Sequence, residues 1–298
     1  MLGELHGVDE VRICFVYADQ PRERLLAEAV AAGAKAHGDD AWSTPKVADP
    51  EEILKQNADV YGMVGVKSRR IFHDVLRAGA HTLYFDKGYT RQRDPKGPRG
   101  WEYWRVCIDS QHPSSYLMDI EYPIDRFETW DKELKPWRED GRHVLFAGSS
   151  EKYHDFHGLN HPTEYATRII GRIKKACGRK VTYRPKPSWG GAEPIEGAGF
   201  SGPTESINSA IKNAWCLVTH GSNAAMDAIL EGIPCVILGD GAAKPISSTD
   251  LGGCKEPKLA SFGERIKWLS ALAYSQFTTA EIASGEMWQH LRPRIIGM

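Results

Sequence analysis

The sequence contains few cysteines and no C-x-x-C pair. Its six cysteines are scattered over 298 residues, and Cys14, Cys216 and Cys235 lie inside apolar stretches, where cysteine behaves as a small hydrophobe. Cysteines inside apolar runs, without a C-x-x-C pair, fit neither a disulfide framework nor a structural zinc site. Both kinds of protein are therefore excluded, and we expect reduced thiols and a cytoplasmic location.

Long apolar segments and an excess of one charge are also missing. No run approaches the roughly 18 apolar residues of a membrane-spanning helix, and the opening residues MLGELHGVDEVR lack an apolar signal core. Lysine and arginine number 38 against 39 aspartate and glutamate, which gives a formal net charge of −1. We therefore expect a soluble protein, in which any surface for nucleic acid is a local patch.

The sequence does have a regular alternation of apolar strands and amphipathic helices. Hydrophobic residues make up 41% and charged residues 26%, so the chain can bury a sizeable core. Alternation of strand and helix with short loops predicts Rossmann-like α/β units. The expected strands are 11–17, 60–66, 81–85, 143–147, 180–184, 215–218 and 233–238, and the expected long helices are 22–37, 68–78, 162–177, 262–274 and 278–291.

The most informative stretch runs from Trp215 to Asp240 and has the pattern of a strand, a turn, a helix and a strand. Two apolar strands around a helix make a βαβ unit, so the sheet is expected to be parallel. The turn is His220-Gly221-Ser222-Asn223. Backbone N–H groups at a helix start can hold an anion, and the glycine permits close approach. Alternatively, Ser222 or Asn223 only caps the helix.

Three parts of this stretch resemble a known family. They are Thr219–Asn223, Asp227-Ala228 and Gly232-Ile233-Pro234. Together they look like the nucleotide-binding segment of GT-B glycosyltransferases, and are most similar to the capsule-polysaccharide and Kdo-transferase type. In that family the loop and helix start hold the diphosphate of a sugar nucleotide. An acidic helix residue often contacts the ribose. Asp227 matches that place, although glutamate is commoner there.

The resemblance is strong over this stretch and loose over the rest of the C-terminal half. It implies two Rossmann-like domains that face each other across a cleft, with C-terminal helices crossing back to the first domain. We predict an acceptor-binding domain at 1–135, a nucleotide-sugar-binding domain at 136–275 and a returning helix at 276–298, with the charged segment 125–140 as the link. The donor that we favour is a UDP-sugar, with no obligatory cofactor and no metal.

Further donor contacts are expected in loops that follow other strands of the second domain. A Gly-Ser loop follows strand 143–147, and Arg-Pro-Lys-Pro follows strand 180–184. In the resembling family a basic proline motif stands at the second place and faces the nucleotide, although these cations alternatively lie on the surface. The candidate donor-binding residues are Gly148, Ser149, Arg184, Lys186, His220, Gly221, Ser222, Asn223, Asp227 and Ser248.

A basic, aromatic segment at 87–105 interrupts the first domain. Basic residues contact phosphates and aromatic rings stack on bases or sugars, while the alternative is a solvated loop. The segment leaves the carboxyl end of a strand, where α/β folds bind ligands. The candidate acceptor-binding residues are Lys87, Tyr89, Arg91, Arg93 and Trp101.

An inverting transferase also needs a base to take the proton of the acceptor hydroxyl. We favour Asp86, at the end of strand 81–85, and keep Asp19 in the first loop as the second choice. Both have alternative roles as caps or ion-pair partners, and a retaining enzyme needs no such base. The spacing of His154, His157 and His161 resembles metal ligands, but no second anchor is evident in the sequence.

The sequence therefore predicts transfer of a sugar from a nucleotide sugar to a hydroxyl. The favoured acceptor is a hydroxymethylated pyrimidine in phage DNA, because the basic aromatic segment suits a base that has to leave the duplex. The protein would then work in the host cytoplasm. The alternative acceptor is a surface saccharide or lipid-linked sugar. Two other classes stay open: a sugar-nucleotide epimerase, and a non-catalytic protein that binds nucleotide or nucleic acid.

Overall fold

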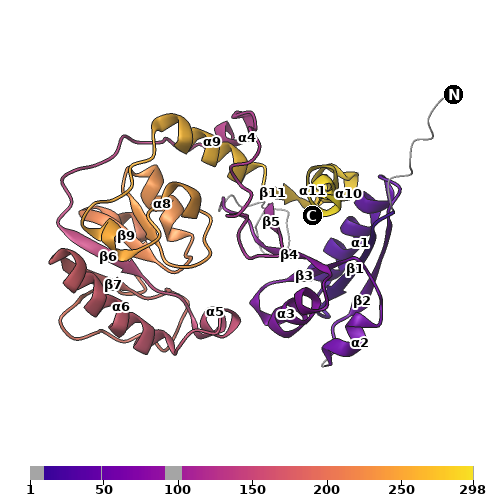
Figure 1. The fold of residues 1–298 in the computed structure, drawn as a ribbon, viewed down its shortest axis with the longest axis horizontal. Coiled ribbons are helices and arrows are strands. Elements are labelled where there is room, and N and C mark those ends of the chain that lie inside the picture. Colours follow the sequence, from indigo (N-terminus) through magenta and orange to yellow (C-terminus); the bar gives the residue numbers. More distant parts are fainter. Residues whose placement is uncertain (1–9, 48, 91–102, 298) are drawn as a thin grey trace. The chain divides into compact units, whose positions relative to one another are not determined.

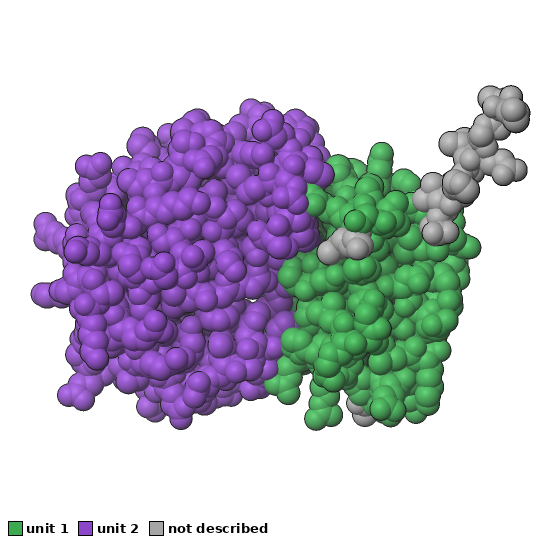
Figure 2. All heavy atoms as spheres, viewed as in Figure 1, with its two compact units in different colours: residues 1–110, 275–298 green, residues 111–274 purple. Residues whose placement is uncertain are grey.

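Two β-sheets, each covered by helices, form the centres of two units (Figure 1). The computed structural model describes residues 10–47, 49–90 and 103–297. Unit 1 comprises residues 1–110 and 275–298, and unit 2 comprises residues 111–274, as Figure 2 colours them. Residues 111–135, which the sequence analysis assigns to the first domain, group with unit 2.

Unit 1 is built on a six-stranded sheet in the order β11-β5-β4-β3-β1-β2. The first four strands of the chain run parallel, β5 is antiparallel to β4, and β11 is antiparallel to β5. The sequence does not predict β2, an edge strand whose alternate residues face solvent, or the three-residue strand β11. The strands are β1 (Arg12–Tyr17), β2 (Asp40–Pro45), β3 (Val60–Val64), β4 (His81–Lys87), β5 (Tyr103–Ile108) and β11 (Gln276–Thr278).

Helices cover this sheet, and the last two of the chain return to pack against the first helix (Figure 1). The predicted helix 278–291 is two helices, because the chain turns at Gly285 with φ of +90°. Thr278 and Glu281 form the capping box of the first of them. The helices of unit 1 are α1 (Pro21–Lys35), α2 (Pro50–Leu54), η1 (Val66–Ser68), α3 (Arg69–Arg77), α10 (Thr279–Ser284) and α11 (Glu286–Ile296).

A buried carboxylate ties the last helix to the start of the sheet. The Asp39 side chain accepts hydrogen bonds from Trp288 Nε1 (2.6 Å), Arg292 Nε (2.6 Å) and Val11 N (2.9 Å). Burial raises the pKa of this carboxyl, but the hydrogen bonds from Arg292, Val11 and Trp288 outweigh burial and the net pKa is lowered. A lowered folded pKa adds stability above the unfolded pKa of about 3.9, and this stability is lost as the pH falls through the folded pKa.

We therefore expect Asp39→Asn to lower the free energy of unfolding at neutral pH by about 3–5 kcal/mol, because it leaves Arg292 without its charge partner. Urea unfolding followed by tryptophan fluorescence measures this difference. The difference between wild type and variant should shrink as the pH falls below about 4 and through the lowered pKa of Asp39, because the protonated carboxyl is then uncharged like the amide. A difference that is the same at both pH values would contradict this role.

Unit 2 is built on a five-stranded parallel sheet in the order β10-β9-β6-β7-β8. One face packs against α6 through buried side chains that include Phe146, Ile169 and Val218. The strands are β6 (His143–Ala147), β7 (Lys180–Arg184), β8 (Gly199–Phe200), β9 (Ala214–Thr219) and β10 (Cys235–Ile237). The helices are α4 (Asp125–Glu128), α5 (Glu151–Phe156), α6 (Pro162–Cys177), α7 (Ile207–Ile211), α8 (Ala224–Leu230), η2 (Lys244–Ile246), η3 (Leu251–Cys254) and α9 (Phe262–Ala273).

The segment 125–140 belongs to unit 2 and does not link the two units. Its backbone pairs with the end of α8, where Lys135 N donates to Leu230 O and Arg138 N donates to Gly232 O. Gly232 has φ of +76°, and a Cβ atom at this position would lie 1.9 Å from Pro136 O, so a side chain there has no room. Charged residues and prolines are typical of a linker between units, but they suit a segment on the surface of one unit equally well. Among the described residues, no helix is long and apolar enough to cross a membrane.

Candidate functional site

The carboxyl ends of the parallel strands of unit 2 bring four loops to one edge of the sheet. Ala147 at the end of β6 is in register with Arg184 on β7 and with Thr219 on β9. Gly148 N donates to Arg184 O at 2.9 Å, and Gly239 N donates to His220 O at 2.9 Å. The structure therefore gathers the candidate residues of the first three loops, which are Gly148, Ser149, Arg184, His220, Gly221, Ser222 and Asn223.

The turn after β9 is held by its own side chains. Thr219 Oγ1 donates to Ala147 O at 2.8 Å and accepts from Ser222 N at 3.1 Å. Ser222 Oγ accepts from Ala224 N at 3.3 Å, whereas Asn223 makes no capping hydrogen bond. Within the described part of the chain, Asn223 Oδ1 is buried without a partner. Helix α8, which follows the turn, has only seven residues.

Gly221 is required by its surroundings. A Cβ atom at this position would lie 2.0 Å from the backbone oxygen of Asp240 and would also overlap the hydroxyl of Tyr153. Real Cβ atoms do not approach a backbone oxygen this closely. The glycine predicted to let a phosphate approach therefore has a second purpose, because it lets the β9 and β10 loops touch.

His220 lies among aromatic rings. Its Nδ1 is 3.0 Å from Tyr153 Oη, and its ring contacts His157 and Tyr165 at centroid distances of 5.3 and 5.9 Å. Burial, followed by the nearby charges of His154 and Lys244, lowers the pKa of His220 to about 4. The imidazole is therefore neutral near pH 7.

The two cations of the Arg-Pro-Lys-Pro motif differ in their surroundings. Arg184 is buried, and its guanidinium donates to Ser201 Oγ at 2.7 Å and to Glu205 O at 2.8 Å. It therefore holds the loop after β8 in place. Lys186 is exposed. The structure thus gives Arg184 a role in folding in addition to any contact with a ligand.

We expect Arg184→Ala to lower the free energy of unfolding by about 1.5–3 kcal/mol, because charged hydrogen bonds are lost. Lys186→Ala should change it by at most about 0.5 kcal/mol but weaken nucleotide binding several-fold. Thermal unfolding and isothermal titration calorimetry separate the two effects. Exposed Lys212 at the end of α7 provides the matched control, Lys212→Ala. Equal binding by the two lysine variants would argue against a nucleotide contact at Lys186.

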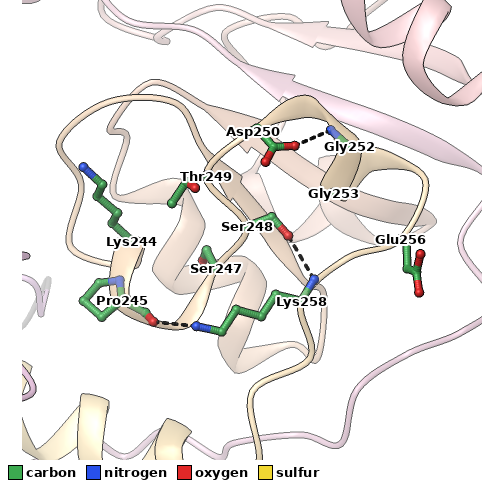
Figure 3. Close-up of a pocket in the computed structure, with 10 residues that line it drawn as sticks. All are labelled: Lys244, Pro245, Ser247, Ser248, Thr249, Asp250, Gly252, Gly253, Glu256 and Lys258. Atoms are coloured by element: carbon green, nitrogen blue, oxygen red, sulfur yellow. Dashed lines mark hydrogen bonds between the residues drawn. The ribbon is translucent and has the colours of Figure 1, made fainter.

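Ser248 lies apart from these loops. It forms a β-bridge with Val236, which pairs with β9 on its other side, so β10 separates Ser248 from the His220 turn. Ser248 Oγ accepts from Lys258 N at 2.9 Å in an open polar pocket of about 620 Å³ (Figure 3). In Figure 3, Lys258 Nζ donates to Pro245 O.

Asp227, the candidate for the ribose contact, is half-buried on α8.

Two residues that were not among the sequence-based candidates complete the edge. Asp240, three residues after the end of β10, accepts from His112 N at 3.2 Å and from Ser114 Oγ. Tyr153 on α5 reaches His220 from the neighbouring loop. Each lies a few residues after a predicted strand, and that position was a usable signal. Their contacts were not readable, because they join segments 67 to 128 residues apart.

In unit 1, Asp86 lies at the end of β4 above a buried arginine. Its Oδ2 accepts from Arg105 at 3.1 Å and from Tyr84 Oη at 3.4 Å, and its side chain is 36% exposed. Lys87 is exposed. Tyr89 is 2% exposed and packs near Arg105, so its ring offers no open face for stacking. The candidates Arg91, Arg93 and Trp101 lie outside the described residues.

Asp19, the second candidate base, is 83% exposed and forms an ion pair with Arg24. His154 and His157, which were considered as metal ligands, bond instead to Asn160 O and Gln111 Oε1. His161 lies near Glu151 at 3.3 Å. No group of three or more His, Cys, Asp or Glu side chains in the described ranges is arranged to hold a metal ion.

Comparison with known proteins identifies the architecture. No family model matches the sequence, and a search of curated proteins finds no match. KpsC of Thermosulfurimonas dismutans, as β Kdo 2,7 transferase, matches with a TM-score of 0.53 and 11% identity over 94% of this chain and 99% of that chain. The β Kdo 2,4 transferase of KpsC from the same organism matches with a TM-score of 0.45 and 10% identity, over 91% of this chain and 93% of that chain. At such identities the likeness shows the fold alone. The predicted fold is confirmed: this chain has the GT-B fold of α/β units, with a parallel sheet in unit 2 and a mainly parallel sheet in unit 1.

Proposed function

We propose that this protein transfers a sugar from a nucleotide sugar to a hydroxyl acceptor. The observation that carries the proposal is the Thr219–Asn223 turn, which contacts the end of β6 and the loop after β10 at the carboxyl edge of a parallel sheet. Ligands bind α/β sheets at this edge. The GT-B fold and the motif that resembles glycosyltransferases agree with it.

The donor side of this proposal lies in unit 2. Backbone N–H groups of the turn, His220 and Lys186 face the phosphates of the donor, with Gly148 and Ser149 beside them and Asp227 toward the ribose. Cations and N–H groups stabilise the charge that builds up on the leaving phosphate. We retain a UDP-sugar as the favoured donor. Ser248 is assigned to the separate pocket beside β10.

The acceptor side lies in unit 1. Three lysines lie after parallel strands at the carboxyl edge of its sheet: Lys46 after β2, Lys67 after β3 and Lys87 at the end of β4. Lysines in such an arrangement favour an anionic acceptor, since they neutralise phosphates. This supports DNA carrying hydroxymethylated pyrimidines as the acceptor, ahead of a neutral saccharide.

Asp86 is the candidate base for this transfer. Burial alone would lower the pKa of Arg105. The negative charge of Asp86, the largest of the opposing effects, helps to outweigh burial, and the net pKa of Arg105 is raised. The guanidinium is therefore a fixed cation under the carboxylate. It orients Oδ2, and each carboxylate oxygen can accept more than one hydrogen bond. An acceptor hydroxyl at Asp86 could thus give up its proton as the new bond to the sugar forms.

The test is incubation with a panel of UDP-, GDP- and CMP-sugars, with and without DNA that contains hydroxymethylated bases. Mass spectrometry of the DNA and assay of free nucleotide are the readouts. Mass gain on the DNA is the expected result. Nucleotide release without DNA gain would move the acceptor to a saccharide, and isomerised donor without transfer would indicate an epimerase. Absence of binding and turnover for every donor would contradict the proposed function.

A further inference from the structure

A tyrosine and a histidine from neighbouring loops form a hydrogen-bonded pair inside the proposed donor site. His220 is the first residue after β9, and Tyr153 lies on α5, which follows the adjacent strand β6. Tyr153 Oη lies 3.0 Å from His220 Nδ1, and the two rings are nearly perpendicular at 78°. Among the described residues this is the ring's one hydrogen bond, so Nε2 is left for a ligand.

Two glycines make room for the pair. A Cβ on Gly239 would overlap the imidazole of His220, and a Cβ on Gly221 would overlap the hydroxyl of Tyr153. Gly239 N also donates to His220 O. The backbone of two loops is thus shaped around this tyrosine and this histidine, which fixes the ring in one orientation.

The position of the single imidazole proton then decides what the ring can do. Near neutral pH the ring has one N–H and one lone pair, because burial and the charges of His154 and Lys244 disfavour the imidazolium. A lone pair on Nε2 would repel a phosphate oxygen, whereas an N–H there would donate to it. The hydrogen bond at Nδ1 selects between these tautomers.

We propose that Tyr153 is a positioning residue: its hydroxyl donates to His220 Nδ1, which places the proton on Nε2, and Nε2–H donates to a phosphate oxygen of the bound nucleotide. This inference rests on the proposed function, since it names how the same site recognises the phosphate. A neutral N–H donor suits a leaving group that gains negative charge during transfer.

The test combines nitrogen NMR of histidine-labelled protein with nucleotide titration. His220→Gln assigns the His220 signals by their loss. We expect wild type, without ligand, to show a protonated Nε2 and an unprotonated Nδ1. Tyr153→Phe should give a mixture of tautomers and bind UDP, GDP or CMP, whichever binds wild type, about tenfold more weakly. A circular dichroism melt checks that the variant is folded.

Tyr165→Phe is the matched control. The Tyr165 ring, on α6, lies 5.9 Å from the His220 ring between centroids, but among the described residues its hydroxyl makes no hydrogen bond to His220. It should leave the tautomer and the affinity unchanged. A protonated Nδ1 in wild type, or an unchanged tautomer and affinity in Tyr153→Phe, would overturn the inference and leave the proposed function intact. If none of the three nucleotides binds wild type, both are wrong.

Discussion

Replacing Asp86 by asparagine is expected to lower the rate of sugar transfer by about 10²–10⁴-fold, the usual contribution of a general base. The amide is nearly isosteric but cannot accept the proton of the acceptor hydroxyl. Nucleotide affinity should stay unchanged, because Asp86 belongs to unit 1 and the donor contacts belong to unit 2. Single-turnover transfer and calorimetry of nucleotide binding measure the two quantities.

Asp19→Asn is the matched control for this prediction. Asp19 also follows a parallel strand, but it is 83% exposed and its partner Arg24 is an exposed cation. Such surface pairs contribute about 0–1 kcal/mol, and the variant should transfer at nearly the wild-type rate. If Asp19→Asn is the slower enzyme, the base is Asp19. If both variants transfer normally, neither carboxylate is the base.

The second large effect is expected from Gly221→Ala, which should weaken nucleotide binding by about 10²-fold, the effect of a displacement near 1 Å at a binding site. The added methyl group meets the backbone oxygen of Asp240, and backbone cannot move aside as a flexible side chain can. Overpacking should also lower the free energy of unfolding by about 1–3 kcal/mol. Calorimetry and urea unfolding provide the two readouts.

Gly171→Ala tests whether any glycine substitution in unit 2 has this effect. Gly171 lies in α6, and a Cβ there meets no atom within 4 Å. Alanine is the better helix former, so this variant should be more stable by up to about 1 kcal/mol and bind as wild type does. Normal nucleotide binding by Gly221→Ala would mean that the contact between the β9 and β10 loops is not needed for the site.

The parts of the fold that were predictable are those with a strong local signal. Buried parallel strands such as 143–147 and 215–218 are continuous apolar runs, and α9 begins at a capping box of Ser261 and Glu264. Strand β2 was missed because its sequence DAWSTP is half exposed and ends in proline. The last helix was predicted as one because Gly285 was read as an interior residue, although it adopts φ of +90°.

The candidate site was predictable only as far as topology makes neighbours of loops. Residues just after parallel strands necessarily share an edge, which is why Gly148, Arg184 and His220 come together. Side-chain partners do not follow from that rule. Arg184 turned out to hold Ser201, and Tyr89 is buried in unit 1. Ser248 is separated from the turn because the chain after β10 adds to the sheet at Val236.

The most direct test of the central claim is amide hydrogen exchange of the protein with and without a saturating nucleotide sugar from the panel. If the Thr219–Asn223 turn holds the phosphates, exchange should slow in peptides that cover 219–223 and 148–149, and stay unchanged in the Ser248 pocket. Slower exchange confined to other segments, or no change with any nucleotide sugar, would contradict the assignment of this turn as the donor site.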